Sequence, residues 1–108
     1  MSKRSESRPS AFEWDPAKAA ANRTKHEVSF EEAETTFDDP AALDAPDMVH
    51  STAEPRMRHL GRSATGTVLM VVYTVRKRSH GQEAIRIISA RRSNRAERAT
   101  YRALAKED

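Results

Sequence analysis

The sequence predicts an α+β protein. Two observations lead to this class. Helix signals occupy residues 11–40, and three β-rich segments follow between residues 56 and 90, before a last helical segment. A length of 108 residues suits one domain with a small core. We therefore expect two N-terminal helices, an antiparallel, twisted sheet of three to four strands and a C-terminal helix.

The first ten residues, MSKRSESRPS, are polar and lack apolar periodicity. Such a segment buries too little apolar surface to offset the conformational entropy lost on folding. We expect a disordered tail over residues 1–10 and a single domain over residues 11–108.

The first helix is expected to follow Asp15, which is a good N-cap residue, because Pro16 suits the first helical position. Phe12 and Trp14 come just before this helix and are expected to pack beneath it. The helix should continue to the segment Lys25–Glu27.

The second helix is predicted by the run VSFEEAETTFDDP. Ser29 and Glu32 have the spacing of a capping box, in which each side chain bonds to the backbone N–H of the other residue. Phe30, Ala33 and Phe37 recur at the spacing of a core-facing stripe. The Asp-Asp-Pro run should end the helix.

The middle of the chain is predicted to form strands. A short edge strand is expected at residues 42–45. The segment RMRHLGR (56–62) alternates, and TVLMVVYTV (67–75) is apolar on both faces, as in a central strand. The segment AIRIISA (84–90) returns after a loop that contains Gly81. These last three strands should form an antiparallel meander.

The last helix is predicted to begin at a second capping box, formed by Asn94 and Glu97, and to reach about residue 105. Its cations lie on one stripe, where like charges repel and so do not stabilise the helix. This stripe is predicted to contact either a polyanion or an acidic partner. Its members are Arg95, Arg98, Arg102 and Lys106.

Charge is divided between the two halves of the chain. Residues 1–54 hold 6 Lys or Arg against 12 Asp or Glu, whereas residues 55–108 hold 13 against 4. Eleven of these 13 cations are arginines, whose planar guanidinium pairs with phosphate through two hydrogen bonds. The asymmetry indicates a polyanionic partner for the second half.

Several function classes have no support in the sequence. The chain has no cysteine, and it has no apolar run long enough to span a membrane. Its four histidines lack metal-ligand spacing, and no nucleotide-binding glycine motif or nucleophile elbow occurs. We therefore expect no metal, no cofactor and a cytoplasmic location.

Four segments, in this order and spacing, resemble the BrnT family of bacterial toxins. They are FEWDPAKAAANRTKHEVSFEEAETTFDDP, RHLGR, VVYTVR and IRIISARRSNRAERATY. The resemblance covers roughly residues 11–104. It departs from the family at Glu27, where BrnT proteins usually have glycine between the first two helices.

The resemblance implies a RelE-like fold and a ribonuclease that blocks translation. It also implies neutralisation by a BrnA-type antitoxin with a ribbon-helix-helix domain, in a heterotetramer of two toxins and two antitoxins. That complex would bind operator DNA through the antitoxin and repress its own operon.

Ribonuclease chemistry without a metal needs cations around the scissile phosphate and groups that transfer protons. The expected phosphate clamp consists of Arg62, Arg86, Arg91 and Arg92. The candidates for proton transfer are Lys25, His26 and His59. Further RNA contacts are expected from Arg95, Arg98 and Arg102. Tyr73 and Tyr101 are expected either to stack on a base or to donate a hydrogen bond.

These assignments depend on convergence of Arg62, Arg86 and Arg91 on one phosphate. Each candidate also has a structural interpretation. Tyr73 would suit the core of an apolar strand, and His26 would suit the C-terminal end of a helix dipole. The alternative function is a basic module that binds nucleic acid or an antitoxin without catalysis, since no definite acid–base pair is apparent.

Overall fold

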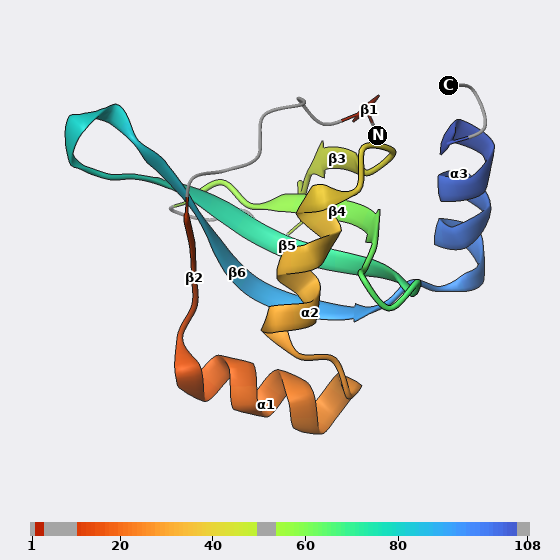
Figure 1. The fold of residues 1–108 in the computed structure, drawn as a ribbon, viewed down its shortest axis with the longest axis horizontal. Helices are drawn as coiled ribbons and strands as arrows, with labels where there is room; N and C mark the ends of the chain where they lie inside the picture. The colour runs from red at the N-terminus through yellow and green to blue at the C-terminus, as the bar shows by residue number, and fades with distance from the viewer. Residues whose placement is uncertain (1, 4–10, 50–53, 106–108) are drawn as a thin grey trace.

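The computed structural model describes residues 2–3, 11–49 and 54–105. Figure 1 shows the elements in chain order. They are β1 (Ser2–Lys3), β2 (Ala11–Glu13), α1 (Pro16–His26), α2 (Phe30–Thr35), the 3-10 turn η1 (Thr36–Asp38), β3 (Leu43–Pro46), β4 (Met57–Arg62), β5 (Val68–Lys77), the 3-10 turn η2 (Ser79–Gly81), β6 (Glu83–Arg92) and α3 (Arg95–Ala105).

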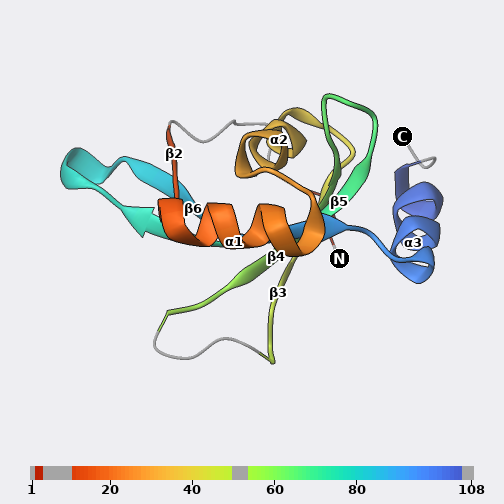
Figure 2. The ribbon, with the colours of Figure 1, turned by 90° about the horizontal axis from the view of Figure 1, so that it is seen from below.

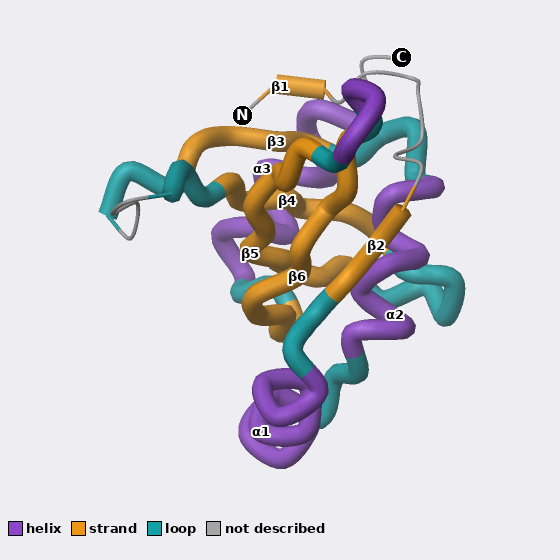
Figure 3. The backbone as a smooth tube through the Cα atoms, turned by 90° about the vertical axis from the view of Figure 1, so that its left-hand side faces the viewer, coloured by secondary structure: helices purple, strands orange, loops and turns teal. Residues whose placement is uncertain are grey.

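The described strands form one sheet in the order β1-β3-β4-β5-β6-β2. The predicted α+β class and the antiparallel meander β4-β5-β6 are confirmed. The prediction of an entirely antiparallel sheet of three to four strands is wrong, because β2 pairs in parallel with β6 and β1 adds a sixth strand (Figure 3). A three-residue strand carries no periodic signal, so its pairing could not be predicted.

The N-terminal segment contributes to the sheet. Ser2 pairs with Asp44 and Lys3 with Leu43, at the edge of the sheet. The rest of the predicted tail, residues 4–10, lies outside the described residues.

Asp15 and Ser29 cap the two helix starts as predicted, but the capping box of Ser29 and Glu32 forms only one of its two bonds. Asp15 accepts a hydrogen bond from the backbone N–H of Ala17 at 2.8 Å, and Ser29 accepts one from that of Glu32 at 3.0 Å. The Glu32 carboxylate bonds to two hydroxyls in the β4–β5 turn, which ties α2 to the sheet. Glu27 ends α1 in the left-handed conformation, with φ of 58°. This is the conformation that glycine adopts without strain.

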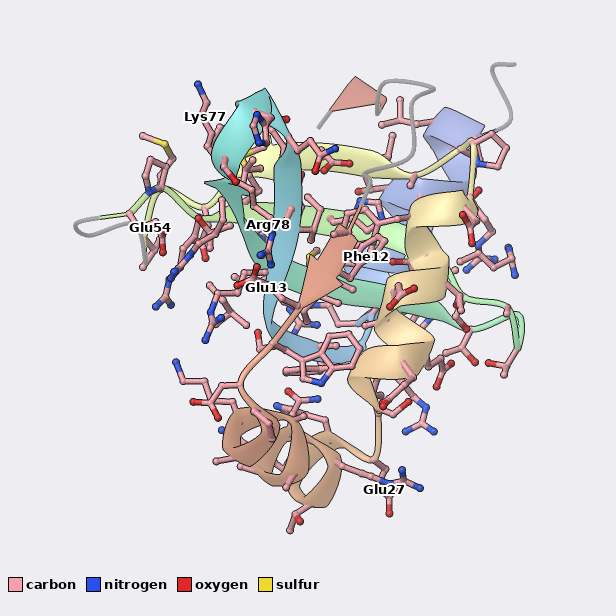
Figure 4. The ribbon with its side chains drawn as sticks, turned by 60° about the vertical axis from the view of Figure 1, so that its left-hand side comes forward. Phe12, Glu13, Glu27, Glu54, Lys77 and Arg78 are labelled. Carbon is pink, nitrogen blue, oxygen red and sulfur yellow. The ribbon has the colours of Figure 1, made fainter. Side chains whose placement is uncertain are left out.

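The larger core lies between the sheet and the first two helices. Helix α2 crosses one face of the sheet (Figures 1 and 2). Its Phe30 and Ala33 pack on apolar side chains of β5 and β6. Phe12 and Trp14 pack against the same cluster, as predicted, and Phe12 points towards α2 in Figure 4.

A smaller core holds α3 against the end of the sheet. Tyr101 packs with Leu43, Leu60 and Met70, which come from three neighbouring strands. The Tyr101 hydroxyl donates to Asp39 at 2.7 Å. Burial, and next the bond to Asp39, raise the pKa of Tyr101. The sheet face opposite α2 is therefore covered by a helix only at one end, where α3 stands (Figure 2).

An irregularity in β6 changes which side chains reach that uncovered face. Val72 pairs with Ser89 whereas Tyr73 pairs with Ile87, so Ile88 is an extra residue in the ladder. Such a bulge lets two consecutive side chains point to the same side. Ile88 and Ser89 accordingly line the same hollow on the uncovered face.

The C-terminal end of α1 is fixed to the edge of β6 by Asn22. Its Nδ2 donates to the carbonyl oxygens of Ala90 at 2.8 Å and Val28 at 3.0 Å. Its Oδ1 accepts from the N–H of Ala90 at 3.1 Å. Beyond the end of β2, the buried Asn22 side chain thus makes the hydrogen bonds to β6 that a neighbouring strand would make. It also fixes the position of His26, which follows one helical turn later.

Candidate functional site

Two of the hollows formed by the described residues are each lined by several arginines. The first, which we call the sheet-face hollow, measures about 500 Å³ and lies on the sheet face opposite α2. Strand β4 supplies Arg58, the residue just before it is Arg56, β6 supplies Arg91, and the end of α1 supplies a histidine. Its lining residues are His26, Asp47, Val49, Arg56, Arg58, Met70, Val72, Ile88, Ser89 and Arg91.

Glu97 of α3 orients two arginines of this hollow. Arg91 donates to both of its carboxylate oxygens, at 2.8 and 2.9 Å, and Arg58 donates to one at 3.4 Å. The hydrogen bonds from Arg91 lower the pKa of Glu97, and they raise the pKa of Arg91 in return. Asn94 and Glu97 also form both bonds of the predicted capping box. Glu97 therefore links the helix start to the guanidinium groups.

The second hollow, the strand-end hollow, measures about 310 Å³ and lies where β6 leads into α3. It gathers four arginines from β4, β6 and α3. Its lining residues are Arg62, Gly66, Thr67, Val68, Arg92, Ser93, Arg98, Tyr101 and Arg102.

The predicted convergence of Arg62, Arg86 and Arg91 is wrong. Arg91 lines the sheet-face hollow and Arg62 the strand-end hollow, whereas Arg86 lines neither. Arg62 and Arg86 pair with residues of β5 that are six positions apart, which corresponds to roughly 20 Å. The prediction failed because it placed arginines on strands without knowing the strand register.

Arg86 instead pairs with Glu13 of β2 at 2.9 Å. Arg78 bonds to the same carboxylate, and Figure 4 shows Glu13 and Arg78 facing each other. The hydrogen bond from Arg86 lowers the pKa of Glu13. The role of Arg86 in the structure is to hold β2 against β6.

His59 does not have the exposure that a proton-transfer group needs. Its side chain is 0% exposed and stacks on the ring of Phe37 at 4.0 Å. Its Nδ1 lies 2.9 Å from Asp44 Oδ1, and its Nε2 lies 3.1 Å from the carbonyl oxygen of Thr36. His59 therefore lies apart from both hollows, and both of its ring nitrogens have protein partners.

The two tyrosines are buried and cannot stack on a base as predicted. Tyr73 is 3% exposed and donates its hydroxyl to Asp44, while Tyr101 is 4% exposed and bonds to Asp39. Burial in the core excludes contact between either ring face and an RNA base. The guanidinium of Arg62 lies 5.5 Å from the Tyr101 ring centre and stacks there instead.

The remaining predicted residues are distributed as follows. His26 joins Arg91 in the sheet-face hollow, and Arg92, Arg98 and Arg102 join Arg62 in the strand-end hollow. Lys25 and Arg95 are exposed and line neither hollow. Lys106 lies outside the described residues.

The sequence analysis missed Arg56, Arg58 and Glu97 as site residues. Arg56 and Arg58 alternate along β4 with Met57 and His59, which face the larger core. That alternation was visible in the sequence. It could have shown that both arginines leave the core on the same side as Arg91, had the register with β5 and β6 been known.

Within the described ranges, no cluster of three or more His, Cys, Asp or Glu side chains is placed to hold a metal ion. The helices of the same ranges include none that is long and apolar enough to cross a membrane.

Comparisons with known proteins agree with this architecture. Residues 14–97 match the family model described as the ribonuclease toxin BrnT of type II toxin–antitoxin systems. Among solved structures, the Brucella abortus ribonuclease toxin BrnT is similar, with a TM-score of 0.57 and 22% identity over 80% of this chain and 100% of that one. At this identity the likeness shows the fold. No curated protein sequence matches the chain.

The family match over most of the chain defines its class, the ribonuclease toxins of type II toxin–antitoxin systems. A protein of this class has RNA as its substrate and an antitoxin as its partner. Within the class, the chain belongs to the BrnT family.

Proposed function

We propose that this toxin is a metal-independent endoribonuclease that cleaves RNA in the sheet-face hollow. The observation that supports the proposal is the meeting of Arg56, Arg58, Arg91 and His26 in one hollow. Guanidinium groups bind phosphate through paired hydrogen bonds, and an imidazole is the commonest side chain for proton transfer. The hollow thus combines a phosphate clamp with a proton-transfer group.

The reaction follows from these roles. The ribose 2′-oxygen attacks the adjacent phosphorus while His26 takes its proton. The bond from phosphorus to the 5′-oxygen breaks, and that oxygen receives a proton from water. The products are a 2′,3′-cyclic phosphate and a 5′-hydroxyl. Arg58 and Arg91 stabilise the negative charge that builds on the phosphate oxygens, as fixed donors do at an oxyanion.

Glu97 has the role of a positioning residue. Its bonds to Arg58 and Arg91 fix both guanidinium groups before RNA arrives, so little reorganisation is needed on binding. The carboxylate also offsets part of the repulsion between the two cations. RNA phosphate would share these arginines with Glu97 or replace it on one of them.

The partners follow from the family. We infer a BrnA-type ribbon-helix-helix antitoxin, a heterotetramer of two toxins and two antitoxins, and repression of the shared operon through operator DNA. We also infer a cytoplasmic site of action and kinship with RelE-like ribonucleases.

Expression in a bacterial host tests the proposed function. The chain alone should arrest growth and cause RNA decay, and co-expression of the neighbouring antitoxin gene should relieve both effects. Arg91→Ala should abolish the arrest, whereas Arg23→Ala, an exposed change outside both hollows, should not. Normal growth with intact RNA, at full expression of folded protein, would favour the alternative of a non-catalytic basic module.

A further inference from the structure

The strand-end hollow brings four arginines together. Arg62 donates to the carbonyl oxygen of Gly66, and Arg98 to that of Ser93. Among the described residues, no carboxylate forms an ion pair with any of the four arginines of this hollow. This contrasts with Arg91 of the sheet-face hollow, which has Glu97 as a partner.

Ser93 adds a donor that also lacks a partner. Ser93 is one of the residues that line the hollow, and it is 4% exposed. The Ser93 Oγ is buried, and it has no hydrogen-bond partner among the described residues. A buried hydroxyl without a partner costs free energy, so a ligand oxygen that accepts from Ser93 would be favoured.

The four cations and the hydroxyl together fit a phosphate group. Arginine pairs with phosphate through two parallel hydrogen bonds, and a serine hydroxyl can donate a further one. Clustered like charges destabilise the unliganded protein, so a bound anion stabilises it by reducing the repulsion between the arginines.

The position of the hollow indicates which phosphate it binds. Arg91 lines the sheet-face hollow, and the next residue, Arg92, lines the strand-end hollow. On β5, Met70 lines the first hollow and Val68 the second, two residues or roughly 7 Å away along the strand. An RNA chain that runs from the sheet-face hollow along β5 therefore reaches the strand-end hollow.

We infer that the strand-end hollow binds a backbone phosphate of the RNA substrate beside the one that is cleaved. This inference rests on the proposed function, because it takes the sheet-face hollow as the cleavage site. It assigns Arg92, Arg98, Arg102 and Ser93 to substrate binding rather than to bond breaking. It predicts that RNAs of several nucleotides bind better than a dinucleotide with a single phosphate.

Binding of uncleavable RNA provides the test. The probes are fully 2′-O-methylated oligonucleotides of two and eight nucleotides, which lack the attacking hydroxyl. The variant is Arg92→Ala/Arg102→Ala, and the matched control is Arg23→Ala, which removes an exposed arginine outside both hollows. The variant should bind the octamer roughly tenfold more weakly, with a smaller loss for the dinucleotide.

Salt dependence supplies a second measurement. The slope of log affinity against log salt for the octamer should fall by about 0.7 if one phosphate contact is lost. Losses equal to those of the Arg23→Ala control, at both lengths, would overturn the inference. Unchanged RNA binding with weakened binding of an oligoglutamate peptide would also overturn it and assign the hollow to an acidic protein segment.

Failure of the proposed function would look different. In that case native protein would leave cleavable RNA intact, or Arg91→Ala would cleave it as well as native protein does. The length-dependent binding of uncleavable RNA does not depend on either result, so the two failures can be told apart.

Discussion

Replacing Asn22 tests how the end of α1 is held on the sheet. The Asn22→Ala variant loses three hydrogen bonds, of 2.8, 3.0 and 3.1 Å. It leaves the N–H and carbonyl of Ala90 without this partner, and Ala90 is 0% exposed. Each net hydrogen bond contributes about 1 kcal/mol, and unsatisfied buried groups cost more. We therefore expect a loss of roughly 3 kcal/mol in the free energy of unfolding.

This loss is a large fraction of the ~5–15 kcal/mol by which domains are stable. Urea unfolding followed by fluorescence measures it, because Trp14 is the single tryptophan and packs on Phe30 at 5.9 Å. Lys18→Ala, an exposed change on the same helix, is the control and should have little effect.

A second variant separates hydrogen bonding from loss of volume. Asn22→Asp keeps the size of the side chain but replaces the Nδ2 donor by an oxygen that faces the carbonyls of Val28 and Ala90. It should be at least as destabilising as Asn22→Ala. Losses below about 1 kcal/mol for both variants would refute the role of Asn22 as a substitute for a strand.

Three further predictions concern stability. Glu27→Gly should raise the free energy of unfolding by about 1 kcal/mol in urea titrations, since it relieves the left-handed conformation of this residue. Tyr101→Phe should lower it by about 1 kcal/mol through loss of the bond to Asp39, measured in the same way. Glu97→Gln should be less stable than native protein at pH 7. Because Arg91 lowers the pKa of Glu97 below its ordinary 4.5, the contribution of Glu97 is present above that value and is lost as the pH falls through the lowered pKa. Thermal unfolding at several pH values should show the difference closing on acidification, and a constant difference would contradict the assignment.

The helix starts could be predicted because capping is local. Asp15, Ser29 and Asn94 each bond to a backbone N–H within three residues, so a short stretch of sequence contains the whole interaction. The central strand was predicted for a similar reason, since β-branched residues on both faces indicate burial from both sides.

The site could be predicted only in part because it depends on pairings between distant strands. Arg91 and His26 were identified, but Arg58 joins them through the register of β4 with β5 and β6. His59 was taken as catalytic because its partner Asp44, on β3, lies 15 residues earlier in the chain and is not apparent from a local pattern. The pairing of Arg86 with Glu13 of β2 spans 73 residues.

Cleavage of RNA by the purified chain tests the central claim most directly. The reaction is run with a chelator present, and the products are examined for 2′,3′-cyclic phosphate ends. His26→Ala and Arg91→Ala should each reduce the cleavage rate by a factor of about 100 or more, measured on the same RNA as native protein. The His26 side chain forms no hydrogen bond with another described residue. The His26→Ala variant should therefore keep the thermal stability of native protein. Undiminished cleavage by both folded variants would contradict the claim that the sheet-face hollow breaks RNA.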